Sequence, residues 1–271
     1  MSVFYPKDYL KIPYAITAQR YTGAYSAGYP AYDPNLTQET EETINPLGLG
    51  IMTTPSDAGE LVTVESTSAG DIGHLIVLEC LDGDGLAVLG FAYLNGVTPV
   101  VVQDGANPAT SNDLVISRVN SVINRSNSQF ASPLSPLNTA GDVLCRNLAG
   151  TVTYNGFKAS DQRSFCLIFT IPSNKMAFFL PAESTINKAG GGQTPSVIMR
   201  TKTRIKGGPW LNNGRWGLQK DGTSAFLFET FDRPYIPPFT DIMVTAESST
   251  ADTDVTGRVP VWVCPAAYYK G

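Results

Sequence analysis

The sequence predicts an all-β fold, and two observations carry that prediction. Short segments rich in branched and aromatic residues recur at intervals of roughly 8–14 residues, separated by glycine, proline or asparagine. No stretch of about twelve residues shows a 3.6-residue apolar period with capping residues at its ends. Many short strands at this spacing are typical of β-sandwiches and jelly rolls. We therefore expect a β-sandwich or jelly-roll-like body made of two β domains.

The individual strands follow from local pattern. ELVTVES (60–66) and DLVISRVNSVI (113–123) alternate between apolar and polar residues, as strands with one buried face do. HLIVLECL (74–81) and LAVLGFAYL (86–94) are apolar runs bounded by glycine, typical of fully buried strands. Further strands are expected at 150–156, 163–171, 175–181, 196–205, 224–231, 241–248 and 257–264. The Ser/Pro/Asn-rich passage 124–138 is expected to be a loop.

Residues 1–45 predict an extended arm. Tyrosines are interleaved there with proline, glycine and alanine, without helical or alternating periodicity. Tyrosine provides a large contact area at low entropic cost, so the arm is expected to lie on a partner subunit; packing on its own domain is the alternative. The candidate partner-binding residues are Tyr5, Tyr9, Tyr14, Tyr21, Tyr25 and Tyr29.

The expected domains are therefore the arm (1–45), a β-sandwich domain (46–156) and a second β-sandwich or jelly-roll domain (157–271). A chain that begins near Leu47 is expected to stay folded without the arm.

Composition and charge limit the function classes. Of 271 residues, 42% are hydrophobic and 16% are charged, so the chain can bury a large core. No run of about 18 apolar residues is present, and the N-terminal region has prolines and charges where a signal peptide has an apolar stretch. The sequence therefore predicts a chain made and used without secretion or membrane insertion.

The net charge of −5 conceals an asymmetry. Residues 21–117 contain thirteen Asp and Glu and no Lys or Arg, whereas residues 158–220 contain ten Lys and Arg and two acids. These are either two solvated faces or surfaces that meet, within the chain or between identical copies. Nucleic acid is not an expected partner, because the acidic half would repel phosphates. The candidate inter-subunit basic strand carries Arg200, Lys202, Arg204 and Lys206.

Motifs for metal binding and catalysis are weak. Asp82-Gly-Asp84-Gly resembles the start of a calcium loop, but Leu-Ala-Val-Leu follows and no further oxygen ligand comes before Asn95. Glycines between apolar runs are instead typical of a hairpin turn. The four cysteines form no CxxC pair and are expected to be buried free thiols, and His74 is the one histidine.

Catalytic carboxylates have no motif either. Glu229 and Asp241 are candidates by position alone, and Gly190-Gly-Gly192 lacks the Lys-Ser/Thr of a phosphate loop. We expect no cofactor, no metal and no enzymatic activity.

One segment is a candidate recognition loop. Pro209-Trp-Leu-Asn-Asn-Gly-Arg-Trp216 places Trp210, Arg215 and Trp216 on a polar stretch. These side chains could stack on sugars or on a partner protein, or the tryptophans could fold back over the end of the sandwich.

The sequence also resembles a family. LDGDGLAVLGFAYLNGVTPVVV (81–102) is similar to a strand, turn, strand and L-N-G-x-T-P-V hairpin found in β-rich virion structural proteins of marine tailed bacteriophages. FTIPSNKMAFF (169–179), RTKTRIKGGPW (200–210) and RPYIPPFTDIMVTAES (233–248) resemble later elements of the same family, with Asn174 where the family usually has glycine. The resemblance covers about residues 60–250 and lies in pattern and order; the Tyr-rich arm is outside it.

The resemblance implies a non-enzymatic structural component of a tailed-phage virion, assembled in the host cytoplasm. Head decoration or a head-to-tail accessory role is expected, with the arm docked on neighbouring subunits. The expected partners are identical copies and other virion proteins such as capsid, portal or tail components. The alternatives are a tail fibre or knob that binds host surface glycan through Trp210, Arg215 and Trp216, and a depolymerising enzyme with paired carboxylates.

Overall fold

The computed structural model describes residues 23–126, 138–159, 161–179, 182–188, 195–219, 223–226 and 235–268. Within these ranges the chain is all-β and has no α-helix, and every pairing between named strands is antiparallel. A short 3-10 helix, η2 (Ala266–Tyr268), follows the last strand. The predicted fold class is therefore confirmed. In the same ranges, no helix has the length and apolar character needed to cross a membrane.

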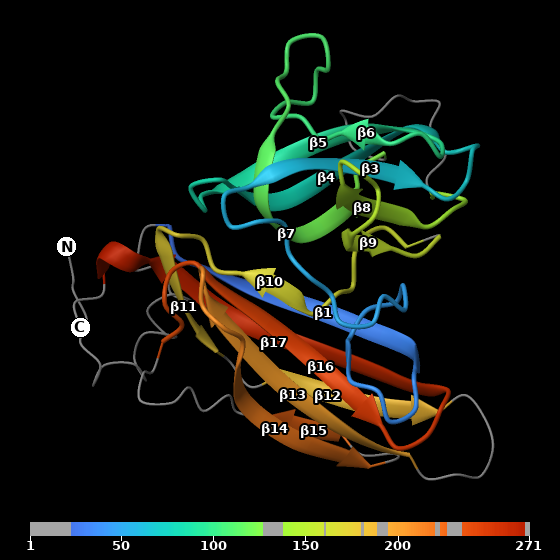
Figure 1. The fold of residues 1–271 in the computed structure, drawn as a ribbon. Coiled ribbons are helices and arrows are strands. Elements are labelled where there is room, and N and C mark those ends of the chain that lie inside the picture. Colours follow the sequence, from blue (N-terminus) through green and yellow to red (C-terminus); the bar gives the residue numbers. More distant parts are fainter. Residues whose placement is uncertain are drawn as a thin grey trace. The chain divides into compact units, whose positions relative to one another are not determined.

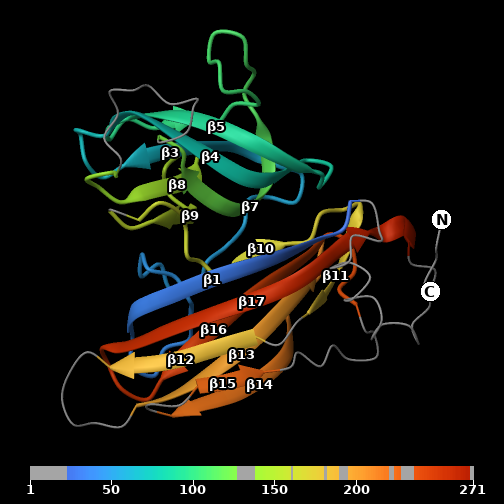
Figure 2. The same ribbon diagram turned by 180° about the vertical axis from the view of Figure 1, so that it is seen from behind.

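The chain forms two compact units (Figures 1 and 2). The central unit is continuous and runs from Ile51 to Cys166. The split unit combines the described residues up to Gly50 with those from Leu167 onward. The sequence-based boundaries at 45/46 and 156/157 thus fall near the junctions at 50/51 and 166/167, but the expected arm and the expected second domain share one unit.

The central unit contains one seven-stranded sheet. Its strands are β3 (Glu60–Ser66), β4 (Ile72–Asp82), β5 (Ala87–Asn95), β6 (Val100–Val101), β7 (Val115–Asn124), β8 (Val143–Asn147) and β9 (Thr153–Phe157). Their order is β5-β4-β7-β3-β8-β9, and β6 pairs with β3. The strand sequences alternate or are apolar throughout, as expected for a curled sheet that surrounds its own core.

Hydrogen bonds bring the β5 edge of this sheet to the segment after β6. The backbone groups of Phe91 and Gln103 exchange two hydrogen bonds of 2.9 Å, and the Val102 amide donates to the Val62 carbonyl at 2.9 Å. Gly90 permits this approach, because a Cβ there would lie 2.5 Å from Val102 Cγ1. The sheet therefore curls back on itself around a buried cluster.

Strand β4 is apolar on both faces. Ile76, Leu78 and Cys80 point into the core of the central unit, together with residues of β3 and β7 such as Val62 and Val122. Leu75 and Val77 lie on the opposite face, because side chains alternate along a strand. The outer face of β4 is therefore not the polar surface that a solvated antiparallel sheet usually presents.

The Asp82 segment is a hairpin turn. The Asp82 side-chain Oδ1 accepts hydrogen bonds from the amides of Asp84 (3.0 Å) and Leu86 (2.9 Å), and the Asp82 carbonyl accepts one from Gly85 (3.0 Å). Gly85 has a φ of 77°, which a side chain would disfavour. The carboxylate thus caps the turn that connects β4 to β5.

The next turn, at Leu94-Asn-Gly96-Val-Thr98, has the same character. The Thr98 amide donates to the Asn95 carbonyl at 3.1 Å, and Gly96 has a φ of 59°. A Cβ at Gly96 would lie 2.7 Å from the Ala69 carbonyl oxygen, so glycine is required for two reasons.

The split unit is a sandwich of two sheets (Figure 1). One sheet has the order β1-β17-β12-β15, with β11 also on β17; these strands are β1 (Tyr25–Leu36), β11 (Lys175–Phe179), β12 (Ala182–Lys188), β15 (Thr223–Phe226) and β17 (Thr253–Pro265). The other has the order β10-β16-β13-β14, with β2 also on β16; these strands are β2 (Glu42–Thr43), β10 (Ile168–Thr170), β13 (Ser196–Ile205), β14 (Leu211–Gln219) and β16 (Thr240–Ser248).

The core of the split unit lies between these sheets. Alternate residues of β17 are buried there: Val255, Val259, Val261 and Val263. Alternate residues of β16 and β13 join the same cluster, including Ile242, Val244, Val197 and Met199. The period-two pattern of these strands therefore directs one face of each sheet to a shared interior.

Most of the described part of the expected arm is sheet structure. Strand β1 pairs with β17 from Tyr25 opposite Val263 to Leu36 opposite Thr253. Ala31 and Leu36 belong to the core of the split unit, and so does Ile44 after β2. Residues 25–45 thus pack on their own unit, which was the alternative considered for the arm.

Candidate functional site

The outer face of β13 carries a network of ion pairs. Arg200 Nη2 lies 2.6 Å from Glu247 Oε2, and Lys202 Nζ lies 2.6 Å from Glu41 Oε1. Arg204 reaches the neighbouring strand β16, where its Nε and Nη2 donate to Asp241 Oδ2 at 2.8 and 2.6 Å. Alternation along β13 directs the three cations to one face, and the register with β16 provides two of the acids.

Two of the carboxylates that pair with these cations, Asp241 and Glu41, accept further hydrogen bonds. Asp241 is fully buried, and its second oxygen accepts a hydrogen bond from Thr170 at 2.7 Å. Burial alone would raise the pKa of Glu41, but hydrogen bonds from Lys202 and Thr245 and the nearby charges of Lys202 and Arg200 lower it overall. The Glu41 carboxylate is therefore stabilised in its charged form.

This network shows where the acidic and basic parts of the sequence meet. Glu41 comes from the acidic stretch and contacts the basic strand within one chain. Lys206 lies after β13 with its Nζ 4.5 Å from the centre of the Phe239 ring. The four predicted inter-subunit cations are thus engaged inside the split unit, and a contact with a neighbouring subunit stays a prediction.

The predicted recognition loop does not form as expected, because residues 211–219 are strand β14. Trp216 lies in the core with 8% of its surface exposed, and its Nε1 donates to Ser184 Oγ at 3.2 Å. The Arg204 guanidinium lies over the Trp210 ring, with its Cζ 4.8 Å from the ring centroid. Arg215 is exposed and lies opposite Arg200 on the neighbouring strand. Strand alternation separates Arg215 from Trp216, so the three side chains do not converge on one surface.

The tyrosines of the expected arm divide into two groups. Tyr25 and Tyr29 belong to β1, where Tyr25 is 44% exposed. The Tyr29 ring stacks on Phe169 of β10 with ring centroids 3.7 Å apart, which joins the two sheets of the sandwich. Tyr5, Tyr9, Tyr14 and Tyr21 lie outside the described residues.

The side chains considered for metal binding and catalysis have structural surroundings. His74 is buried, with its Nδ1 3.0 Å from Ser126 Oγ. The cysteines are free and buried as expected, and burial raises the pKa of the Cys80 thiol to about 12. Within the described ranges, no three His, Cys, Asp or Glu residues are grouped to hold a metal ion. Glu229 and the Gly190–Gly192 segment lie outside those ranges.

A buried acidic pair lies where β1 ends. Asp33 is 1% exposed and Glu42 is 4% exposed. Asp33 accepts hydrogen bonds from the amides of Asn35 (3.1 Å) and Asn45 (3.5 Å). Burial raises the pKa of Asp33 to about 6, and the charge of Glu42 acts in the same direction. We therefore expect the stability of the split unit to depend on pH through Asp33.

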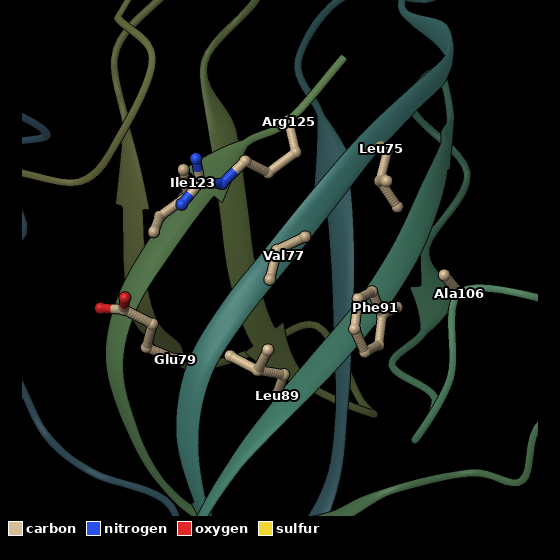
Figure 3. Close-up of a pocket in the computed structure, with 8 residues that line it drawn as sticks. All are labelled: Leu75, Val77, Glu79, Leu89, Phe91, Ala106, Ile123 and Arg125. Atoms are coloured by element: carbon tan, nitrogen blue, oxygen red, sulfur yellow. The ribbon is translucent and has the colours of Figure 1, made fainter. Parts of the chain in front are cut away.

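The central unit has an apolar groove on the outer face of its sheet (Figure 3). Its volume is about 530 Å³, and it is lined by Leu75, Val77, Glu79, Leu89, Phe91, Ala106, Ile123 and Arg125. Val77 of β4 lies opposite Phe91 of β5 on one side and Ile123 of β7 on the other, so the floor is a row of paired apolar side chains. The sequence did not lead us to expect this groove, although the run HLIVLECL (74–81), apolar except for His74 and Glu79, was its signal.

Comparisons with known proteins provide little further information. No family model matches the chain, and no curated protein matches it. Among solved structures, the chain is similar to one described as the structure of infectious bursal disease virus, Gx strain. The identity is 12%, the TM-score is 0.26, and the match covers 90% of this chain and 73% of that chain. A likeness of this degree does not establish a shared fold.

Proposed function

We propose that this chain is a non-enzymatic structural component of a tailed-phage virion, at the head or the head-to-tail junction, that joins its neighbours through its N-terminal segment. The observation that carries the proposal is the family resemblance of residues 60–250, read together with the structure of the elements involved. Residues 81–102 of that resemblance correspond to β5, β6 and the two tight turns at Asp82 and Gly96. The segments 169–179, 200–210 and 233–248 contribute to β10, β11, β13 and β16. The segments that resemble the family therefore contribute strands to both units.

The structure refines which residues are available for docking. Because β1 and β2 belong to the split unit, the docking segment of the proposal is residues 1–22, which include Tyr5, Tyr9, Tyr14 and Tyr21. The glycan-binding alternative depended on Trp210, Arg215 and Trp216 acting together. Trp216 is buried in the core, so we do not propose that role.

Location in the particle is the direct test. Particles would be purified from cells that make this protein and probed by quantitative mass spectrometry and by immunogold labelling. We expect a constant copy number per particle and label on the head or neck. A protein that stays in the soluble fraction after particles are removed would contradict the proposal, and label at the fibre tips would favour the host-binding role.

A further inference from the structure

We propose that the apolar groove of the central unit binds the N-terminal segment, residues 1–22, of a second copy of this chain. The inference rests on the proposed function, because it names the surface through which neighbouring copies would be joined.

The groove has the character of a binding surface. Leu89 is 52% exposed in it, on the same strand as Phe91 and opposite Glu79 of β4. Figure 3 shows Val77, Leu89, Phe91 and Ile123 side by side on β4, β5 and β7. An antiparallel sheet with one face on the core usually presents polar residues on the other face. In this groove Leu75, Val77 and Ile123 are 9% exposed or less and form an apolar floor, with Leu89 exposed beside them. An apolar hollow of this kind is typical of a binding site, and 530 Å³ lies within the range of ligand pockets.

Two charged side chains also line the groove. Glu79 and Arg125 come from β4 and from directly after β7. Figure 3 shows the Glu79 carboxylate on the β7 side of the apolar floor, and the Arg125 side chain extending over Ile123 on the same side. An occupant therefore needs apolar side chains for the floor, with a cation and an anion along the β7 side.

Residues 1–22 meet this requirement. The sequence MSVFYPKDYLKIPYAITAQRYT contains Phe4, Leu10, Ile12 and four tyrosines among its 22 residues. Lys7 and Lys11 can pair with Glu79, and Asp8 can pair with Arg125. A chain of this length spans at most roughly 75 Å when extended, which is enough to reach a neighbouring subunit.

The test uses the full chain and three variants. The groove variant carries Leu89→Ser and Phe91→Ser, and the arm variant carries Tyr9→Ser and Leu10→Ser. The control carries Ile72→Ser and Leu148→Ser, which remove two exposed apolar side chains of the same unit outside the groove (62% and 58% exposed). Sedimentation velocity gives the self-association constant of each protein, and thermal melting shows that each is folded.

We expect the wild type and the control to associate equally. The groove variant and the arm variant should each associate on the order of ten- to a hundredfold more weakly, as the loss of two apolar side chains from an interface implies. Mixing the groove variant with the arm variant should restore dimers, because each provides the part that the other lacks. A fluorescent peptide of residues 1–22 should bind the arm variant and not the groove variant.

Three results would overturn the proposal. These are a wild type that stays monomeric at every concentration, a groove variant that associates like the control, and a mixture that forms no dimers although the peptide binds. The last result would indicate that the segment occupies the groove of its own chain. Each result leaves the labelling of particles unchanged, so failure of this inference is distinct from failure of the proposed function.

Discussion

The two units of the chain bury their cores in different ways. The central unit is built from one continuous segment, and its strands pair mostly with partners fewer than 90 residues away. The split unit is completed by β1, which pairs with β17 more than 200 residues later in the chain. The central unit therefore depends on shorter connections, whereas the split unit depends on two long-range pairings, β1 with β17 and β2 with β16, whose loop-closure entropy must be offset by burial.

The outer faces of the two units differ as well. On the split unit, β13 carries cations paired with Glu41, Asp241 and Glu247. On the central unit, the outer face of β4 is apolar and forms the groove. The ion pairs provide partners for the charges of the first face, whereas on the second face Leu89 is exposed and an occupant that covers it would be stabilised by apolar burial. This difference is the reason to seek the docking surface on the central unit.

The largest expected effect comes from removal of β1 and β2. A chain that begins at Leu47 lacks Ala31, Leu36 and Ile44, which are all in the split-unit core. At about 1.5–3 kcal/mol per large buried side chain, together with the lost pairing to β17, the split unit should lose on the order of 5 kcal/mol or more and unfold. Calorimetry should show the central-unit transition alone.

This expectation replaces the sequence-based one that a chain starting near Leu47 stays folded. The control begins at Gly23 and keeps both strands, so it should retain both transitions. Two transitions in the Leu47 chain would mean that the pairing of β1 with β17 contributes little to the split unit.

The ion pair between Arg204 of β13 and Asp241 of β16 should give the next largest effect. Arg204→Met leaves the fully buried Asp241 carboxylate with the Thr170 hydroxyl but without its guanidinium. Breaking one side of a buried pair typically costs 3–5 kcal/mol, and because Arg204 is 21% exposed we expect about 3 kcal/mol. The urea midpoint of the split unit measures this loss. Arg215→Met on the exposed face of β14 is the control and should change stability by less than about 0.5 kcal/mol.

The pH dependence of stability should differ between the units because of Asp33. Its pKa rises from 3.8 in the unfolded chain to about 6 in the fold, so the fold binds the proton more tightly. The contribution of Asp33 to the free energy of unfolding is fully present below pH 3.8 and is lost as pH rises through about 6, a change of about 3 kcal/mol. Between pH 4.5 and 7 the split-unit Tm should therefore fall.

The Asp33→Asn variant provides the comparison, since it cannot titrate. Its split-unit Tm should have a weaker pH dependence across the same window, measured by calorimetry in buffers of constant ionic strength. Parallel curves for the two proteins would show that Asp33 titrates alike in the folded and unfolded chain.

The reactivity of the cysteine thiols should show which of the two units is unfolded. Cys80, Cys145 and Cys166 belong to the central unit and Cys264 to the split unit, and all four are buried. Burial raises the pKa of Cys80 and of Cys264 to about 12, so the native thiols should react slowly with Ellman's reagent at pH 8. In the chain that begins at Leu47, we expect Cys264 alone to react quickly. Rapid reaction of Cys80 in that chain would mean that the two units unfold together.

The sequence alone determined the fold class and most of the strands with strong patterns. The segments 60–66 and 196–205 coincide with β3 and β13, and the apolar runs at 74–81 and 86–94 lie within one residue of β4 and β5 or inside them. Local chemistry was enough there, because alternation and apolar runs fix which side chains can be buried. The turns at Asp82 and Gly96 were predictable for the same reason, since glycine and aspartate have local conformational effects.

Only the tertiary structure decided the roles of β1, β12 and β14. YSAGYPAYDPNL, AESTINK and LNNGRWGLQ contain proline, glycine or polar residues that weaken a strand pattern. Their conformation comes from partners far away in sequence: β17 pairs with β1 and β12, and β13 pairs with β14. The same long-range pairings place Trp216 in the core and Glu41 beside Lys202, and the alignment of β4, β5 and β7 creates the groove. Such contacts depend on register between distant segments, which no local pattern in this sequence specifies.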